Sequence, residues 1–417
     1  MMKENIQEEL KAAHEATIAV KRLQDAEKQQ LLTGIADSLE KRIDEVIQEN
    51  KKDLERMDQE DPRYDRLLLN KDRILALSTS LKDVANLPDP TGLLISSKKL
   101  ENGLLVEKKT VPLGVVGVIY ESRPNVTVDV AALCIRSGNV CVLRGGSDAW
   151  YTNRILVEII QDELRNNHLD TNIVQLLPTD RAFVSELLSA TGYVDIIIPR
   201  GSQALIELVR EQAKVPVIET GAGVCHTYVE RSGDLEKAAK IIANAKIQRP
   251  SVCNALDTVL VDREVARDLL AQVVPYFKES SVKIYADKTA YAILHELGYP
   301  LLELAQEEDF GREFLSLQCS IKVVEGFEEA LSHIAEHSSK HSECIVSSDA
   351  ERIHTYMETV DAAAVYTNAS TRFTDGGAFG LGAEIGISTQ KLHARGPFAL
   401  EKLVTEKWYI TGDGQIR

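Results

Sequence analysis

The alternation of short β-forming runs with helical stretches, from about residue 103 onward, constrains the fold of this chain more than any other feature. Apolar runs such as VVGVIY and NVCVLRG are each followed by a helical stretch, for example SDAWYTNRILVEIIQDEL. The runs IVQLL, YVDIII and VPVIE are expected to be further strands. Strands joined through helices pair in parallel, so this order predicts a doubly wound α/β sheet. The same texture returns after about residue 230, which predicts a second α/β unit.

The two ends of the chain have a different pattern. Apolar residues recur at helical spacing over residues 3–58, which predicts two or three amphipathic helices, and a further helix is expected over 71–86. The final run WYITGDGQIR is β-like and is expected to pair with residues 103–110. A chain of 417 residues is also too long for one ordinary domain.

The net charge and the cysteine content limit the expected classes of binding partner and the expected cellular compartment. With 48 Lys and Arg against 64 Asp and Glu the formal charge is −16, which argues against nucleic acid and anionic membranes as partners. The sequence contains neither an apolar run of about 18 residues nor the apolar core of a secretory signal. Six cysteines without a CxxC pair indicate reduced thiols, so a cytoplasmic location is expected.

Cys253 stands in NAKIQRPSVCNALD, where a helical pattern stops before Pro250 and apolar β-forming residues resume. A cysteine at such a junction can be exposed while its backbone is held on both sides, and its thiolate is a strong nucleophile for acyl groups. Cys225, beside Gly223 and His226, is the competing candidate. The remaining cysteines lie in apolar runs typical of a core: Cys134, Cys141, Cys319 and Cys344.

Two strand–turn–helix segments are candidates for binding phosphate. The sequence has no G-x-G-x-x-G after a strand and no Walker A motif. In YVDIIIPRGSQALIELVREQ, however, Gly201 and Ser202 stand at a helix start, where free N–H groups and the helix dipole attract phosphate. In GNVCVLRGGSDA, Arg144 ends a strand beside two glycines. The Gly-rich run over residues 374–386 is expected to be a linker or a functional loop.

A histidine series raises the question of a metal. His333, His337 and His341 are four residues apart and could share a helical face as ligands. Ser338 and Ser339 are expected to end the helix before the third histidine, and no carboxylate or thiolate completes a convincing set. We therefore expect no metal centre.

Taken together, the motifs resemble those of the γ-glutamyl phosphate reductase family of the aldehyde dehydrogenase superfamily. The stretch from Val324 to Glu343 fits, and the other matching segments, in order over nearly the full chain, are PLGVVGVIYESRPNVTVDVAALC, VLRGG, IPRG, GVCH, NAKIQRPSVCN, EFLSL, NASTRFTDGGAFGLGAE and STQKLHARGP. The resemblance implies two doubly wound α/β domains and a small β oligomerisation arm. The implied parts are the N-terminal helices with the NADP-binding domain (1–98, 112–230 and 382–402), the catalytic domain (231–381) and the arm (99–111 and 403–417).

The resemblance also implies the chemistry. Cys253 would attack the acyl phosphate of L-glutamate 5-phosphate and expel phosphate. The thioester would accept hydride from NADPH and leave as L-glutamate 5-semialdehyde, the second step of proline biosynthesis. The oxyanion would be bound by the Cys253 N–H and a side chain of the SRPN turn, Ser122 or Asn125. Glu219 lies near the place of the superfamily's hydrolytic base, which a reductase does not need, so a structural or cofactor-adjacent role is expected.

The ligand-binding residues follow from the same resemblance. Arg144 would meet the adenosine ribose, where a guanidinium can bind a 2′-phosphate through two hydrogen bonds and so favour NADPH over NADH. Gly201 and Ser202 would hold the pyrophosphate, and Glu313 with Phe314 in EFLSL the nicotinamide ribose. The candidates for the anionic groups of the small-molecule substrate, with no assignment among them, are Arg123, Arg249, Arg372 and Arg395.

The arm implies a homodimer or homotetramer, and pathway logic suggests an association with glutamate 5-kinase. Three other interpretations stay open. They are a hydrolytic NAD(P)-dependent aldehyde dehydrogenase, a non-catalytic homologue that serves as an interaction subunit, and a histidine metal protein.

Overall fold

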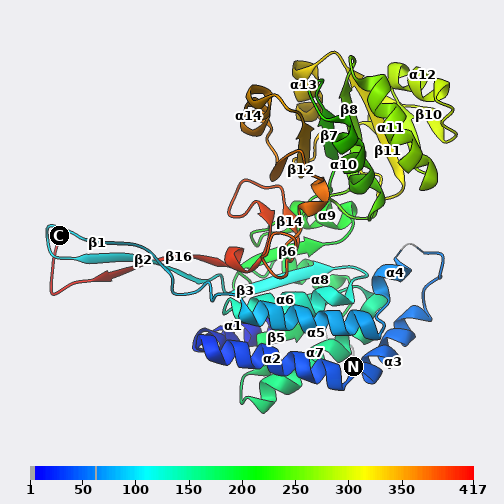
Figure 1. Ribbon diagram of the computed structural model, residues 1–417. Coiled ribbons are helices and arrows are strands. Elements are labelled where there is room, and N and C mark those ends of the chain that lie inside the picture. The colour runs from blue at the N-terminus through cyan, green and yellow to red at the C-terminus, as the bar shows by residue number, and fades with distance from the viewer. Residues whose placement is uncertain (1–4, 62) are drawn as a thin grey trace. The chain divides into compact units, whose positions relative to one another are not determined.

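The computed structural model describes residues 5–61 and 63–417, which form two compact units (Figure 1). The first unit comprises the described residues up to Thr220 together with Gly380–Gly386 and Pro397–Arg417. The second comprises Gly221–Phe379 and Ile387–Gly396. Within the described part of the chain, no helix combines the length and the apolar character that crossing a bilayer requires.

The first unit is built on a four-stranded parallel sheet in the order β5-β4-β3-β6. Its strands are β3 (Val115–Tyr120), β4 (Val140–Gly145), β5 (Val174–Leu176) and β6 (Ile196–Arg200). The helices that follow them are α6 (Pro124–Arg136), α7 (Trp150–Asn166), α8 (Ala182–Leu188) and α9 (Gln203–Gln212). Because β3 and β4 are buried at every position, their sequences are mostly apolar rather than alternating, with Arg144 near the end of β4 as the charged exception.

The expected N-terminal helices are present from residue 7, while residues 3 and 4 of the predicted stretch lie outside the described residues. They are α1 (Gln7–Lys21), α2 (Asp25–Lys41), α3 (Ile43–Leu54), α4 (Tyr64–Leu67) and α5 (Lys71–Asn86). Helix α5 packs against α2 and α6, and Figure 1 shows it beside α6. Arg136, fully buried at the end of α6, pairs with Asp25 of α2 at 2.6 Å, which ties these helices together.

A three-stranded antiparallel ribbon forms the arm of the first unit, labelled β1, β2 and β16 in Figure 1. Its strands are β1 (Leu94–Lys99), β2 (Leu105–Pro112) and β16 (Val404–Thr411). The predicted pairing of the C-terminal run is confirmed, with Trp408 opposite Lys108. The arm also contains residues 94–98, which the sequence had placed with the helices, because β1 is exposed at every position and carries no alternating apolar pattern.

The second unit contains a seven-stranded parallel sheet in the order β10-β9-β11-β8-β7-β12-β13. The strands are β7 (Cys225–Val229), β8 (Leu256–Asp262), β9 (Lys283–Ala286), β10 (Leu302–Leu304), β11 (Gln318–Val324), β12 (Ser342–Val346) and β13 (Ala364–Thr367). The helices are α10 (Leu235–Ile247), α11 (Ala266–Glu279), α12 (Lys288–Glu296), α13 (Phe327–His337) and α14 (Ala350–Thr359). The core lies between these helices and the central strands.

Two expectations need correction. The boundary between the units lies at residue 221 rather than near 230, because β7 pairs with β8 and β12 in the second sheet. These partners stand far along the chain, so the local pattern around β7 does not reveal them. The VPVIE run is also not a strand, since Val217 makes only an isolated bridge with Ile197.

Candidate functional site

Cys253 lies in the turn between α10 and β8, at the helix-to-strand junction that the sequence predicts. It is partly exposed, whereas the other five cysteines are buried. Burial raises the pKa of the Cys225 thiol well above its usual value and raises the pKa values of Cys319 and Cys344 to about 12. These three thiols stay protonated at neutral pH, so Cys253 is the better placed nucleophile of the competing pair.

The competing thiol, Cys225, instead supports the turn. Its Sγ donates to the Cys253 carbonyl oxygen at 3.3 Å. Gly223 packs even more closely, because a Cβ built there would lie 1.5 Å from the same carbonyl oxygen. Only glycine fits at this point of contact between two backbones. The Gly223 N–H donates to Glu313 Oε1 at 2.9 Å, so this glycine connects the nucleophile turn to the EFLSL loop.

Asn254, next to the nucleophile, fixes a second segment to the turn. Its Nδ2 donates to the carbonyl oxygens of Arg372 and Thr374 at 3.2 and 2.9 Å. In return the Thr371 hydroxyl donates to the Asn254 carbonyl at 2.8 Å. The short 3₁₀ turn Thr371–Phe373 is thereby held against the residue that follows Cys253. Asn254 was not among the predicted site residues, although its polar side chain directly beside the thiol was the available signal.

Arg372 and Arg249 bring positive charge to this turn. Burial and the neighbouring Arg249 lower the pKa of Arg372, while Asp375 and the thiol of Cys253 act in the opposite sense. The Arg372 Nε is buried and has no hydrogen-bond partner among the described residues. A buried, unsatisfied guanidinium N–H beside a nucleophile suits an anionic ligand. Of the four candidate substrate arginines, Arg372 thus interacts electrostatically with both Arg249 and Cys253.

The other two arginines have different surroundings. Arg395 pairs with Asp361 at 2.7 Å, and Lys391 also pairs with that carboxylate at 3.0 Å. These hydrogen bonds lower the pKa of Asp361. Arg123 belongs to the first unit, at the start of α6.

The candidate oxyanion residues lie in the same stretch of the first unit. Ser122 has a φ of +44°, unusual for a residue with a side chain, and its hydroxyl donates to Asp148. Asn125, in the first turn of α6, donates from Nδ2 to Asp129 at 3.1 Å. Burial raises the pKa of Asp129 to about 6. Both candidate side chains are thus oriented by carboxylates of their own unit.

The phosphate-binding turns meet at one edge of the first sheet. Arg144 is the second-last residue of β4 and Gly201 follows β6. Both strands pair with β3, so the two residues lie at the carboxyl edge where nucleotides bind such sheets. Arg144 is 9% exposed and donates to the Thr179 carbonyl at 2.8 Å, while its Nε has no hydrogen-bond partner within the described residues. Burial lowers the pKa of Arg144, and the nearby Glu121 raises it.

The N-terminus of α9 already receives an anionic group. The Ser202 hydroxyl caps the helix by accepting from the Leu205 N–H at 3.4 Å. The Ser202 N–H donates to the Glu121 carboxylate at 2.9 Å. A Cβ on Gly201 would lie 2.5 Å from that carboxylate. A carboxylate at this place, and the unsatisfied Arg144 Nε at the same sheet edge, fit the phosphates of a dinucleotide, which would have to displace Glu121.

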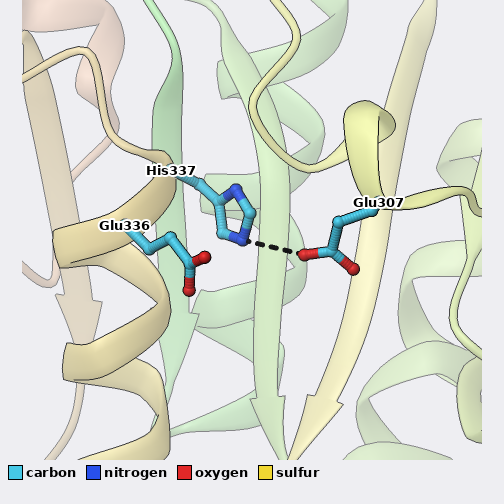
Figure 2. Close-up of side chains that lie close together, drawn as sticks. All are labelled: Glu307, Glu336 and His337. Carbon is cyan, nitrogen blue, oxygen red and sulfur yellow. Dashed lines mark ion pairs between the residues drawn. The ribbon is translucent and has the colours of Figure 1, made fainter.

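The three histidines of the series do not lie on one helix. Helix α13 ends at His337, as predicted from the serines that follow, so His341 lies outside it. The Nδ1 of His333 faces the Lys322 ammonium at 3.2 Å, which is an unfavourable neighbour for a metal. Within residues 5–61 and 63–417, one group could offer three ligand atoms: Glu307, Glu336 and His337 (Figure 2).

Two carboxylates thus lie beside His337, where the sequence was expected to offer no convincing set of ligands. In Figure 2 the His337 ring lies between the two carboxylates, with Nε2 3.4 Å from a Glu307 oxygen. The Glu307 side chain is 81% exposed. An exposed ion pair of this kind is ordinary on a protein surface.

Comparison with known proteins shows the family of the chain. Residues 1–292 match the model of the aldehyde dehydrogenase family. The chain is 53% identical over 418 residues to a γ-glutamyl phosphate reductase of Legionella pneumophila, covering 100% of both chains. It is 54% identical over 415 residues to that of Chlorobaculum parvum, covering 99% of each.

Solved structures show similarity to the same family. The crystal structure of γ-glutamyl phosphate reductase from Thermotoga maritima superposes with a TM-score of 0.94 at 39% identity, covering 99% of this chain and 100% of that one. An acetylating aldehyde dehydrogenase from Geobacillus thermoglucosidasius has the same fold, with a TM-score of 0.71 at 16% identity over 99% and 97% of the two chains. This chain is thus an oxidoreductase of the aldehyde dehydrogenase family and belongs, within it, to the γ-glutamyl phosphate reductases.

Proposed function

We propose that the chain catalyses the NADPH-dependent reduction of L-glutamate 5-phosphate to L-glutamate 5-semialdehyde with release of phosphate. The observation that carries this proposal is the environment of Cys253, a partly exposed thiol with Arg249 and Arg372 beside it. The names of the full-length relatives, at more than 50% identity, support the same substrate.

Cys253 performs the first step. Its Sγ attacks the γ-carbonyl carbon, the bond from that carbon to the phosphate oxygen breaks, and phosphate leaves with the electron pair. A thioester to Cys253 remains. The guanidinium groups of Arg249 and Arg372 stabilise both the thiolate and the departing phosphate. Arg123 and Arg395 are left as candidates for the α-carboxylate of the substrate.

The oxyanion that forms at each addition needs hydrogen-bond donors. The Cys253 N–H is one donor, and the resemblance assigns the second to Ser122 or Asn125. Since Asp148 and Asp129 orient these two side chains, either one is held ready before the substrate arrives.

NADPH, when bound, supplies the hydride that reduces the thioester. Arg144 binds the 2′-phosphate through its unsatisfied N–H and so favours NADPH over NADH. The α9 N-terminus at Gly201 and Ser202 binds the pyrophosphate in place of Glu121. Glu313 and the adjacent Phe314 position the nicotinamide ribose. Glu219 serves no hydrolytic step in this scheme, and its carboxylate lies 4.0 Å from the Arg210 guanidinium.

The arm is proposed to pair copies of the chain into a homodimer or homotetramer. It carries exposed apolar side chains, including Leu94, Trp408 and Ile410 at 55, 56 and 63% exposure. An isolated thin sheet with such residues is unstable in water unless something covers it. The cytoplasmic location and the association with glutamate 5-kinase rest on the cysteine pattern and on pathway logic.

The reaction is best tested in reverse, because the acyl phosphate is labile. The protein is mixed with L-glutamate 5-semialdehyde and NADP⁺, with and without inorganic phosphate, and NADPH absorbance is followed. The proposal predicts NADPH formation that requires phosphate. Formation at the same rate without phosphate would instead support a hydrolytic aldehyde dehydrogenase and would restore Glu219 as its base.

A further inference from the structure

The EFLSL loop of the second unit contains a strained residue. Leu315 has a φ of +52°, a conformation that residues with a side chain rarely adopt. Leu315 is also 42% exposed, so its own burial does little to hold the turn. Other groups must therefore fix the loop around it.

A buried ion pair, Lys246 with Asp257, hydrogen-bonds to the backbone of this loop on both sides of Leu315. On one side the Phe314 N–H donates to Asp257 Oδ1 at 3.0 Å. On the other the Lys246 ammonium donates to the Ser316 carbonyl at 3.2 Å. The two charged groups lie 3.8 Å apart and are 2 and 0% exposed. A carboxylate and an ammonium thus bind the N–H and the C=O groups that flank the strained residue.

The same ion pair is also connected by hydrogen bonds to the turn that carries Cys253. The second oxygen of Asp257 accepts from the Cys225 N–H at 3.4 Å. Cys225 in turn donates its thiol to the Cys253 carbonyl at 3.3 Å. Lys246 also lies 5.9 Å from the centre of the Phe314 ring. A buried ion pair is costly to desolvate, and a pair of apolar residues would suit the core equally well. Its contacts therefore indicate a role in holding the loop.

We propose that Asp257 and Lys246 are positioning residues that hold the Phe314–Ser316 turn, and so present the Glu313 carboxylate to the nicotinamide ribose. The cofactor half of this inference rests on the proposed function. The clamp, meaning the hydrogen bonds from Asp257 and Lys246 to the Phe314–Ser316 turn, does not depend on the proposed function, because every contact in it is made by the chain alone.

The test compares Asp257→Asn and Lys246→Met with a matched control, Asp262→Asn. Asp262 stands at the other end of β8, is 4% exposed, and accepts from the Tyr228 hydroxyl at 2.6 Å and the Arg231 N–H at 3.0 Å. Its substitution also removes a buried carboxylate from the same strand, without touching the loop. Hydrogen exchange is measured by mass spectrometry on the peptide covering residues 311–317 in the full chain without cofactor. NADPH binding is measured by the fluorescence of the nucleotide.

Either clamp variant should exchange the 311–317 amides at least tenfold faster than wild type and bind NADPH at least fivefold more weakly. The control should leave both quantities within twofold of wild type, even if its melting temperature falls. Unchanged exchange in both clamp variants would overturn the clamp. Faster exchange with unchanged NADPH affinity would overturn the positioning role. If wild-type protein fails to bind NADPH, the proposed function and the cofactor half are wrong, and the exchange data still decide the clamp.

Discussion

Cys253 and Cys225 are neighbours in the second unit, and their side chains have different roles: that of Cys225 supports the turn, and that of Cys253 is available for reaction. Cys225 is buried, its raised pKa keeps the thiol protonated, and it donates to the Cys253 carbonyl. Cys253 is partly exposed on a turn that Gly223 and Asn254 hold in place. At the scale of single residues, reactivity here follows from exposure, and the exposure follows from a backbone held by close packing.

Replacement of Gly223 by alanine should damage the turn. The added Cβ would fall on the backbone of Cys253, which cannot move aside as a flexible side chain could. We expect a loss of about 1–3 kcal/mol in the free energy of unfolding, measured by urea denaturation, together with a loss of reductase activity. The control is Gly192→Ala, where a Cβ would meet no atom within 4 Å. Equal stability of the two variants would contradict this account.

At the scale of elements, the site is assembled from turns at the ends of strands and helices. The α10–β8 turn supplies the nucleophile, the Thr371–Phe373 turn supplies Arg372, and the loop before β11 supplies Glu313. These turns stand about 60 to 120 residues apart in the sequence, and single buried side chains connect them. Asn254 and Asp257 are the two main connectors.

The substitution Asn254→Ala should lower catalytic efficiency beyond any loss of folding stability. It removes the two hydrogen bonds that the Asn254 side chain donates to the Arg372 segment and keeps the one accepted by its backbone carbonyl. The kcat/KM of the reverse reaction should therefore fall about 10–100-fold, an effect typical of a misplaced positioning group. The control is Asn50→Ala in the first unit, which removes a buried amide bonded to the Leu67 carbonyl at 2.9 Å. That variant should lose stability and keep kcat/KM per folded molecule. Equal kcat/KM in the two variants would exclude the connecting role of Asn254.

At the scale of the whole molecule, the local sequence pattern predicted the parallel α/β fold and the pairing of the C-terminal run with β2. The spacing of apolar residues that marks a strand or a helix is a local property, so it can be read directly from the sequence. The position of β7, the missing strand at VPVIE and the role of Asp257 escaped prediction, because each depends on partners tens of residues away. A carboxylate within the apolar ALDTVLV run was the visible sign of Asp257.

The arm gives a second prediction at this scale. Changing Trp408 and Ile410 together to aspartate places charge on the proposed contact between copies, so the oligomer should dissociate to monomers in light-scattering chromatography. Leu392→Asp is the control, because this side chain is 84% exposed in the second unit and lies outside the arm. Monomeric wild-type protein, or an arm variant of unchanged size, would contradict the oligomerisation role.

The central claim is that Cys253 is the nucleophile, and its most direct measurement is the phosphate-dependent formation of NADPH from L-glutamate 5-semialdehyde by two matched variants, Cys253→Ala and Cys225→Ala. Both remove one thiol from the same small region, and only the first removes the exposed one. The account predicts no detectable NADPH with Cys253→Ala and retained activity, per folded molecule, with Cys225→Ala. Full activity in Cys253→Ala, or loss confined to Cys225→Ala, would contradict it.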